Sequence, residues 1–150
     1  MVTKALSGGA GLEAYLAKLG EKVSSASSVK VGFLEGATYP DGTPVAMIAA
    51  IQNFGAPKRS IPPRPFFSNM IDKHGSEWGG EVAELLDRTG FDSALTLELM
   101  GERIEGQLRQ EIVDTNSPPL SPKTIARKGG REKPLIDTAH MIGSIDSEVS

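Results

Sequence analysis

Proline constrains this chain more than any other residue, and its effect is greatest in residues 53–67. Because proline breaks a helix interior and removes a hydrogen-bond donor from a sheet, this stretch is neither one helix nor a central strand. Gly55 is expected to end one helix and Pro65 to begin the next. A residue before proline adopts β or polyproline geometry, so residues 61–63 are expected to be extended. We therefore predict a stiff connection and call residues 53–67 the elbow.

Two segments before the elbow show regular periodicity. Residues 12–23 place apolar side chains at spacings of three and four, which predicts a helix with one apolar face. The glycine-rich residues 1–11 are expected to be a flexible N-terminus. Residues 29–33 alternate between β-branched or aromatic side chains and others, which predicts a β-strand.

Helices are predicted on both sides of the elbow. Thr43 is a candidate N-cap with Pro44 at the first helical position, which predicts a helix from there to Gly55. After the elbow, apolar residues recur every three or four positions over residues 67–85, which predicts a longer helix. Glycines at positions 79 and 80 destabilise a helix interior and predict a bend or break there.

The best amphipathic pattern covers residues 92–114 and predicts a helix capped by Asp92 or Ser93. Its expected apolar stripe consists of Leu97, Met100, Ile104, Leu108 and Ile112. The opposite face carries acidic residues that include Glu111. It also carries Glu105 and Arg109, four residues apart in the order that favours an ion pair.

Residues 118–133 form a second segment stiffened by proline. Ser121 followed by Pro122 predicts a short helix that ends near Arg127. The segment contains the most basic part of the chain, and we call residues 123–133 the basic loop. Beyond it, Asp137 is expected to cap a short helical turn.

The C-terminal residues complete the predicted fold. Residues 145–149 are expected to form a final strand that pairs with residues 29–33. A chain of 150 residues is the usual size of one domain, so a single domain over residues 1–150 is expected. Its predicted class is α+β, with a small sheet packed by several amphipathic helices and with the elbow and the basic loop attached.

Composition narrows the possible functions. The net charge of -3 argues against a protein that wraps nucleic acid, because such domains are usually basic. The absence of cysteine excludes disulfides, thiolate catalysis and cysteine zinc sites. No run approaches the ~20 apolar residues of a membrane span, and the N-terminus has no pattern of a signal peptide. A product of the cytoplasm without a cofactor is expected.

The histidines do not indicate a catalytic or metal site. His74 and His140 have no histidine or carboxylate at the i, i+4 ligand spacing of an H-E-x-x-H motif, so no metal site is predicted. His74 lies on an apolar stripe and is expected to be structural. Asp137 beside His140 admits a hydrolase, but a helix cap is the more typical role of such an aspartate. Nucleophile-elbow, phosphate-loop and dinucleotide motifs are missing, so we expect a protein that is not an enzyme.

The two stiff segments are the candidate contact surfaces, because arginine and phenylalanine often anchor protein interfaces. The candidate interface residues are Lys58, Arg59, Ile61, Arg64, Phe66 and Phe67 in the elbow and Lys123, Arg127, Lys128, Arg131 and Lys133 in the basic loop. Two alternatives are open for the basic loop. It could contact phosphate, or it could be a solvated surface, which is the commoner role of such a run.

Three motifs, taken together, resemble a known family. The first combines AAIQNFG at residues 49–55 with IPPRPFF at residues 61–67. The second is PPLSPKTIARKG at residues 118–129, and the third is KPLIDTAHM at residues 133–141 followed by Ser-Ile at 144–145. This set is similar to phage virion proteins of the tail-completion or neck type, which lie at the head–tail junction of long-tailed phages.

The resemblance implies a structural role in the virion. Copies of the chain would form a ring between the portal-side connector and the tail tube, in contact with other connector and tail proteins. DNA would pass through the ring without specific binding, and a net acidic subunit suits that, because each neutralised phosphate adds affinity. Two other functions stay open: a nucleic-acid-binding accessory protein that uses the basic segments, and a small hydrolase that uses His140 with Asp137.

Overall fold

A computed structural model describes residues 9–115, 118–130 and 139–150. In chain order the elements are α1 (Gly9–Val23), β1 (Val29–Phe33), α2 (Val45–Phe54), the 3-10 helix η1 (Pro57–Arg59), α3 (Phe66–Arg88), α4 (Ser93–Asp114), α5 (Pro122–Arg127), α6 (His140–Gly143) and β2 (Ile145–Val149). Helices dominate and the two strands form a small sheet, so the predicted α+β class is confirmed.

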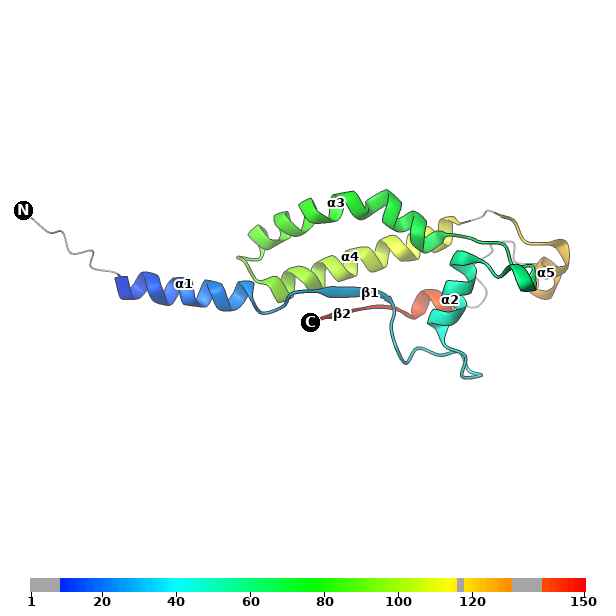
Figure 1. The fold of residues 1–150 in the computed structure, drawn as a ribbon, viewed down its shortest axis with the longest axis horizontal. Helices are drawn as coiled ribbons and strands as arrows, with labels where there is room; N and C mark the ends of the chain where they lie inside the picture. The colour runs from blue at the N-terminus through cyan, green and yellow to red at the C-terminus, as the bar shows by residue number, and fades with distance from the viewer. Residues whose placement is uncertain (1–8, 116–117, 131–138) are drawn as a thin grey trace, which may run out of the picture.

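The molecule is elongated, and its two ends differ. The long helices α3 and α4 run side by side along the long axis, and β1 lies against α4 (Figure 1). Helix α1 extends beyond one end of this body, whereas α2 and α5 lie at the other end (Figure 1). None of the described helices has the length and apolar character that a membrane crossing requires.

The predicted strand pairing is confirmed. β1 and β2 are antiparallel, with Val29 opposite Val149 and Phe33 opposite Ile145. The sheet packs on α4 at Gly101, where a Cβ atom would lie 2.8 Å from the Oγ of Ser147. Glycine therefore allows the sheet to approach the helix closely.

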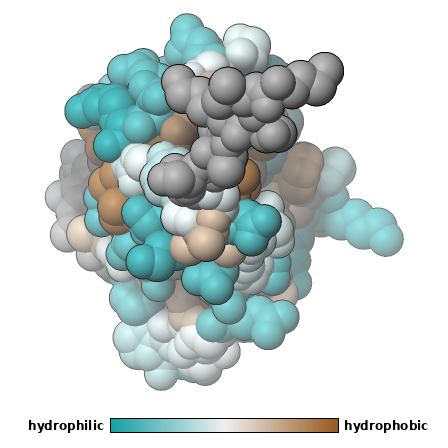
Figure 2. Space-filling model, turned by 90° about the vertical axis from the view of Figure 1, so that its left-hand side faces the viewer, coloured by the Kyte–Doolittle hydropathy of each residue, from teal (hydrophilic) through white to brown (hydrophobic). Residues whose placement is uncertain are grey.

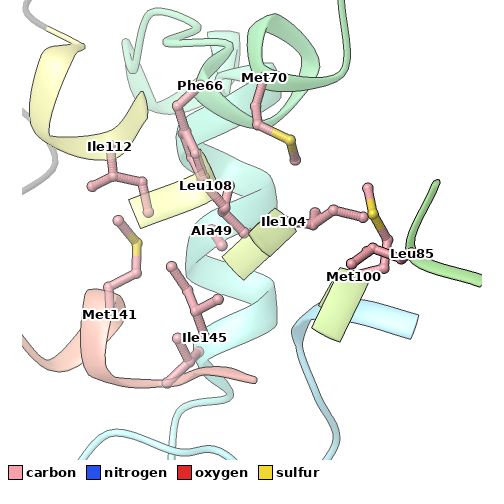
Figure 3. Packing of buried hydrophobic residues seen from close by; sticks show 11 residues of the cluster. Ala49, Phe66, Met70, Leu85, Met100, Ile104, Leu108, Ile112, Met141 and Ile145 are labelled. Atoms are coloured by element: carbon pink, nitrogen blue, oxygen red, sulfur yellow. The ribbon is translucent and has the colours of Figure 1, made fainter. Parts of the chain in front are cut away.

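The hydrophobic core lies where α3 and α4 face α2, α6 and β2 (Figure 3). Met100, Ile104, Leu108 and Ile112 of the predicted α4 stripe are buried, which confirms that face. The other buried hydrophobic residues are Val45, Ala49, Phe66, Met70, Leu85, Met141 and Ile145.

Polar contacts join α3 to α4 beside this core. The Lys73 Nζ donates to Glu111 Oε2 at 2.6 Å, and Trp78 Nε1 donates to Gln107 Oε1 at 2.9 Å. Glu111 is buried, so the prediction that it lies on the exposed face of α4 is wrong. The reason is that Lys73 reaches across from α3 and pairs with its carboxylate, which allows the charge to be buried.

The start of α2 differs from the prediction. Pro44, not Thr43, occupies the N-cap position, and no side chain caps this helix. Thr43 belongs to the preceding turn, where its backbone N–H donates to Asp41 Oδ1 at 2.9 Å. Gly55 ends the helix as predicted and has a φ of 76°.

The other helix boundaries largely follow the prediction. Asp92 caps α4 and accepts a hydrogen bond from the backbone N–H of Leu95 at 3.0 Å. The prediction for residues 79–80 was a bend or a break. The break is absent, because α3 is continuous there, and the helix bows along its length (Figure 1). Asp137 lies outside the described residues, and the N-cap position of α6 belongs to Ala139.

Candidate protein-interaction site at the proline-rich end

The elbow is a loop closed by backbone hydrogen bonds. Ala56 and Ile61 exchange two backbone hydrogen bonds, of 2.9 and 3.1 Å, which close the loop around η1. A Cβ atom on Gly55 would lie 2.8 Å from the backbone nitrogen of Pro63, so only glycine fits at this position. These contacts are those that a stiff connection requires, and the helical turn η1 inside the elbow was not predicted.

A buried amide joins the two ends of the elbow. The Asn53 Oδ1 accepts hydrogen bonds from the backbone N–H groups of Phe67 and Ser68, at 3.0 and 3.2 Å. Its Nδ2 donates to the Oγ of Ser68 at 3.1 Å. The residue before α3, Pro65, makes no side-chain cap. Asn53 therefore caps α3 from the end of α2, a role that local sequence patterns do not reveal.

Two residues expected on the elbow surface are buried, so that expectation is wrong for them. Phe66 is fully buried in the core, because it begins α3 on the face that packs against α4. Arg64 is 5% exposed, and its Nε donates to the carbonyl of Pro118 at 3.0 Å. Burial lowers the pKa of the Arg64 guanidinium from its ordinary value. Arg64 thus fastens the elbow to the segment that follows α4.

The second proline segment forms the short helix that its sequence predicts. Ser121 is the N-cap of α5 and its Oγ accepts from the backbone N–H of Thr124. Pro122 occupies the first turn. Lys123 and Arg127 are exposed and Lys128 is half-buried, so α5 displays its charges at this end of the molecule.

The elbow and the second segment line one cleft of about 820 Å³. The apolar part of its wall comes from Ile48, Ile61, Pro62, Pro119, Leu120 and Met141, and its polar part includes Tyr39, Asp41, Gln52, Arg64, Thr124, Arg127 and Lys128. Basic side chains outnumber acidic ones in this wall. A wall that combines apolar and basic side chains suits contact with an apolar, acidic surface of another protein.

The flanking loop gives the cleft a second rigid wall. The Asp41 carboxylate accepts from the backbone N–H of Thr43, and this hydrogen bond is the main cause that lowers the pKa of Asp41. The His140 Nε2 lies 2.8 Å from the carbonyl oxygen of Thr38, and its ring packs on Tyr39 with centroids 4.9 Å apart. These contacts give His140 a structural role beside the cleft.

The remaining predicted residues occupy several places. Lys58 and Arg59 are exposed on η1, and Phe67 lies in apolar hollows beside β1. Arg131 and Lys133 lie outside the described residues. In the part of the chain that the structure describes, His, Asp and Glu side chains form no cluster that could hold a metal ion.

Sequence reasoning found the two segments but not that they meet. The prolines predicted stiffness, whereas the contact between Arg64 and Pro118 depends on the packing of α3 against α4. The contributions of Tyr39, Ile48 and Met141 were also missed, and their sequence context carries no signal for them. No protein family, curated protein or solved structure matches this chain in comparisons with known proteins.

Proposed function

We propose that this chain is a structural virion protein at the head–tail junction of a phage, of the tail-completion or neck type. It assembles with copies of itself and with neighbouring connector or tail proteins around the DNA path. The observation that carries the proposal is the convergence of the three motifs of the resemblance on one stiff cleft. If the cleft is a contact surface for another protein, the convergence of motifs that are far apart in the sequence is explained.

The convergence is specific in its residues. The cleft receives Gln52, Ile61 and Arg64 from the first motif, Leu120, Thr124 and Arg127 from the second, and Met141 from the third. The first and last of these positions are about ninety residues apart in the chain, and prolines restrict the backbone of the elbow and of residues 118–122. A preformed surface loses little conformational entropy when a partner binds, which favours stable assembly.

The opposite charge on another face supports passage of DNA. Glu98, Glu102, Glu105 and Asp146 line a separate hollow along α4 and β2. Carboxylates repel phosphate, so a conduit that presents such a face would not hold the duplex. In this proposal the basic cleft contacts protein, and the acidic face is the one suited to lie near DNA.

Joining of heads and tails tests the proposal. Particles of the encoding phage that lack this protein should accumulate unjoined heads and tails, and the purified chain should restore joining. The double substitution Arg127→Ser with Lys128→Ser removes charge from the cleft and should reduce joining. The control, Lys30→Ser with Arg88→Ser, removes the same charge from β1 and α3 and should leave joining unchanged. Normal joining without the protein would refute the proposal.

A nucleic-acid-binding accessory protein is the second candidate, favoured only by the adjacent Arg127 and Lys128 on the cleft rim. It predicts duplex binding at low salt that weakens steeply as salt is added. A gel-shift titration separates the two candidates, because the assembly protein should give no shift. A shift that the Arg127→Ser, Lys128→Ser variant abolishes would favour the second candidate.

A further inference from the structure

Helix α1 carries an apolar face that the described part of its own chain leaves uncovered. Leu12, Leu16, Leu19 and Val23 lie on one side of this helix, and no residue of α1 is buried. Leu12 is 59% exposed and Leu16 is 53% exposed. Figure 2 views the molecule from the end where α1 projects and shows hydrophobic side chains among the hydrophilic ones on this face. Isolated helices of about 15 residues are marginal in water, so this one needs a surface to pack on.

The base of α1 is fixed to the body. The Ser93 Oγ accepts from the backbone N–H of Ala26 at 3.0 Å and donates to the carbonyl of Lys22 at 3.1 Å. The backbone N–H of Ala94 donates to Ser25 Oγ at 3.1 Å. These bonds hold the helix in a direction away from the body (Figure 1), so we call α1 the arm.

The body carries an apolar groove of matching character. One hollow of about 460 Å³ lies between β1, α3 and α4, and a second of about 530 Å³ lies between β1, α2 and α3. Val31, Phe67 and Ile71 line both hollows, so they form one continuous groove. Along α3 the groove runs from Phe67 to Val82.

The groove is long enough to receive the arm. From Leu12 to Val23 the arm advances eleven residues, which is roughly 16 Å at 1.5 Å per residue. The groove wall along α3 from Phe67 to Val82 advances fifteen residues, which is roughly 22 Å. The whole apolar face of the arm can therefore lie along the groove.

A glycine leaves the groove wall open. Gly79 is exposed, and a Cβ atom there would meet nothing within 4 Å. A larger side chain at this position would therefore project into the groove without disturbing the rest of the chain.

We propose that the arm of one copy packs its apolar face into the groove of a second copy of this chain. The two halves of the contact lie on different surfaces of each molecule, so the association is head to tail and leads to a ring if the rotation closes. The inference deepens the proposed function, because it identifies the surfaces through which copies in a ring would meet. Self-association through these surfaces is nevertheless a property of the isolated chain.

Two variants with matched controls test the proposal by sedimentation velocity over a range of protein concentration. Leu16→Glu places a charge on the apolar face of the arm, and Ala17→Glu places the same charge on its polar face. Gly79→Glu fills the groove, and Gly80→Glu adds the same side chain at an exposed neighbour outside the groove. Glutamate favours a helix more than glycine does, so neither substitution on α3 threatens the fold.

The wild type and both controls should form oligomers, and Leu16→Glu and Gly79→Glu should each associate at least about tenfold more weakly. A mixture of the two disrupted variants should form dimers and nothing larger, because one supplies an intact groove and the other an intact arm. A monomeric wild type overturns the proposal, as does normal assembly of the Gly79→Glu variant, which would indicate pairing between arms. A mixture that stays monomeric also overturns it.

The outcome is separable from the proposed function. A wild type that is monomeric yet restores head–tail joining refutes the contact between arm and groove and leaves the virion role standing. A wild type that oligomerises through the arm yet is dispensable for joining refutes the virion role alone.

Discussion

α4 packs closely against the sheet because residue 101 is a glycine and has no side chain. A Cβ atom on Gly101 would lie 2.8 Å from Ser147 Oγ and 3.1 Å from Val29 Cγ2. Both neighbours belong to the paired strands, so they cannot move apart without disturbing the sheet. The same helix contains Gly106, whose Cβ would meet nothing within 4 Å. Substitution of these two glycines by alanine should therefore change the stability of the fold in opposite directions.

We expect Gly101→Ala to destabilise the fold by about 1 kcal/mol, because overpacking outweighs the gain in helix propensity. Gly106→Ala is the control and should stabilise the fold by up to about 1 kcal/mol. Urea denaturation followed by circular dichroism measures both. Equal stabilisation by the two substitutions would show that the sheet does not approach α4 at Gly101.

The cap that Asn53 provides gives a second prediction at the scale of one residue. Asn53→Ala leaves the amides of Phe67 and Ser68 without their acceptor and should cost roughly 2 kcal/mol of stability. Asn53→Asp keeps the acceptor and places a negative charge at the start of α3, which is favourable, so its loss should be smaller. The midpoints of urea denaturation measure the stability of both variants. Equal losses of stability for Asn53→Ala and Asn53→Asp would contradict the capping role of Asn53.

At the scale of elements, the cleft depends on the attachment of the second proline segment to the elbow. Arg64 makes this attachment through the carbonyl of Pro118. In the described residues Arg64 forms no ion pair with a carboxylate, so its buried charge rests on hydrogen bonds such as this one. Its role is to position the cleft wall rather than to meet a partner.

Arg64→Met should loosen α5 relative to the elbow while the long helices stay intact. Hydrogen exchange at the amides of Ile125 and Lys128 should accelerate by about tenfold. The reason is that local unfolding of α5 would no longer have to break the hydrogen bond between Arg64 and Pro118. The control, Arg88→Met, removes an exposed arginine of α3 and should leave these amides unchanged. Unchanged exchange in Arg64→Met would mean that α5 is held by other contacts.

Much of the element order was predictable because its signals are local. The cap at Asp92, the cap at Ser121 and the glycine at position 55 mark helix boundaries through contacts within a few residues. The strand pairing was also predicted, since residues 29–33 and 145–149 supply the two strand patterns.

Tertiary context decided what could not be predicted. Arg64 and Glu111 are charged and were expected on the surface, but each is buried by a partner from a distant segment. Glycines at positions 79 and 80 did not break α3, because the helix is long and packs along α4. The sequence therefore predicted the segments that form the candidate site, but not how these segments are arranged in space.

At the scale of the whole molecule, the proposed roles are separated in space. The arm and the cleft-lining helices α2 and α5 lie at opposite ends of the long axis (Figure 1), and the acidic hollow lies along α4 and β2. A subunit of this design can contact a copy through the arm and groove while the cleft contacts a different protein. The central claim is that the proline-stiffened end is a docking surface.

The proposed function places this surface at a phage head–tail junction, so a density map of that junction in intact particles tests the claim most directly. We expect the protein in the junction, with Ile61 and Arg127 of each copy in contact with a neighbouring subunit and with the elbow conformation unchanged. A map in which the cleft of every copy faces solvent, or in which the protein is absent from the junction, would contradict it.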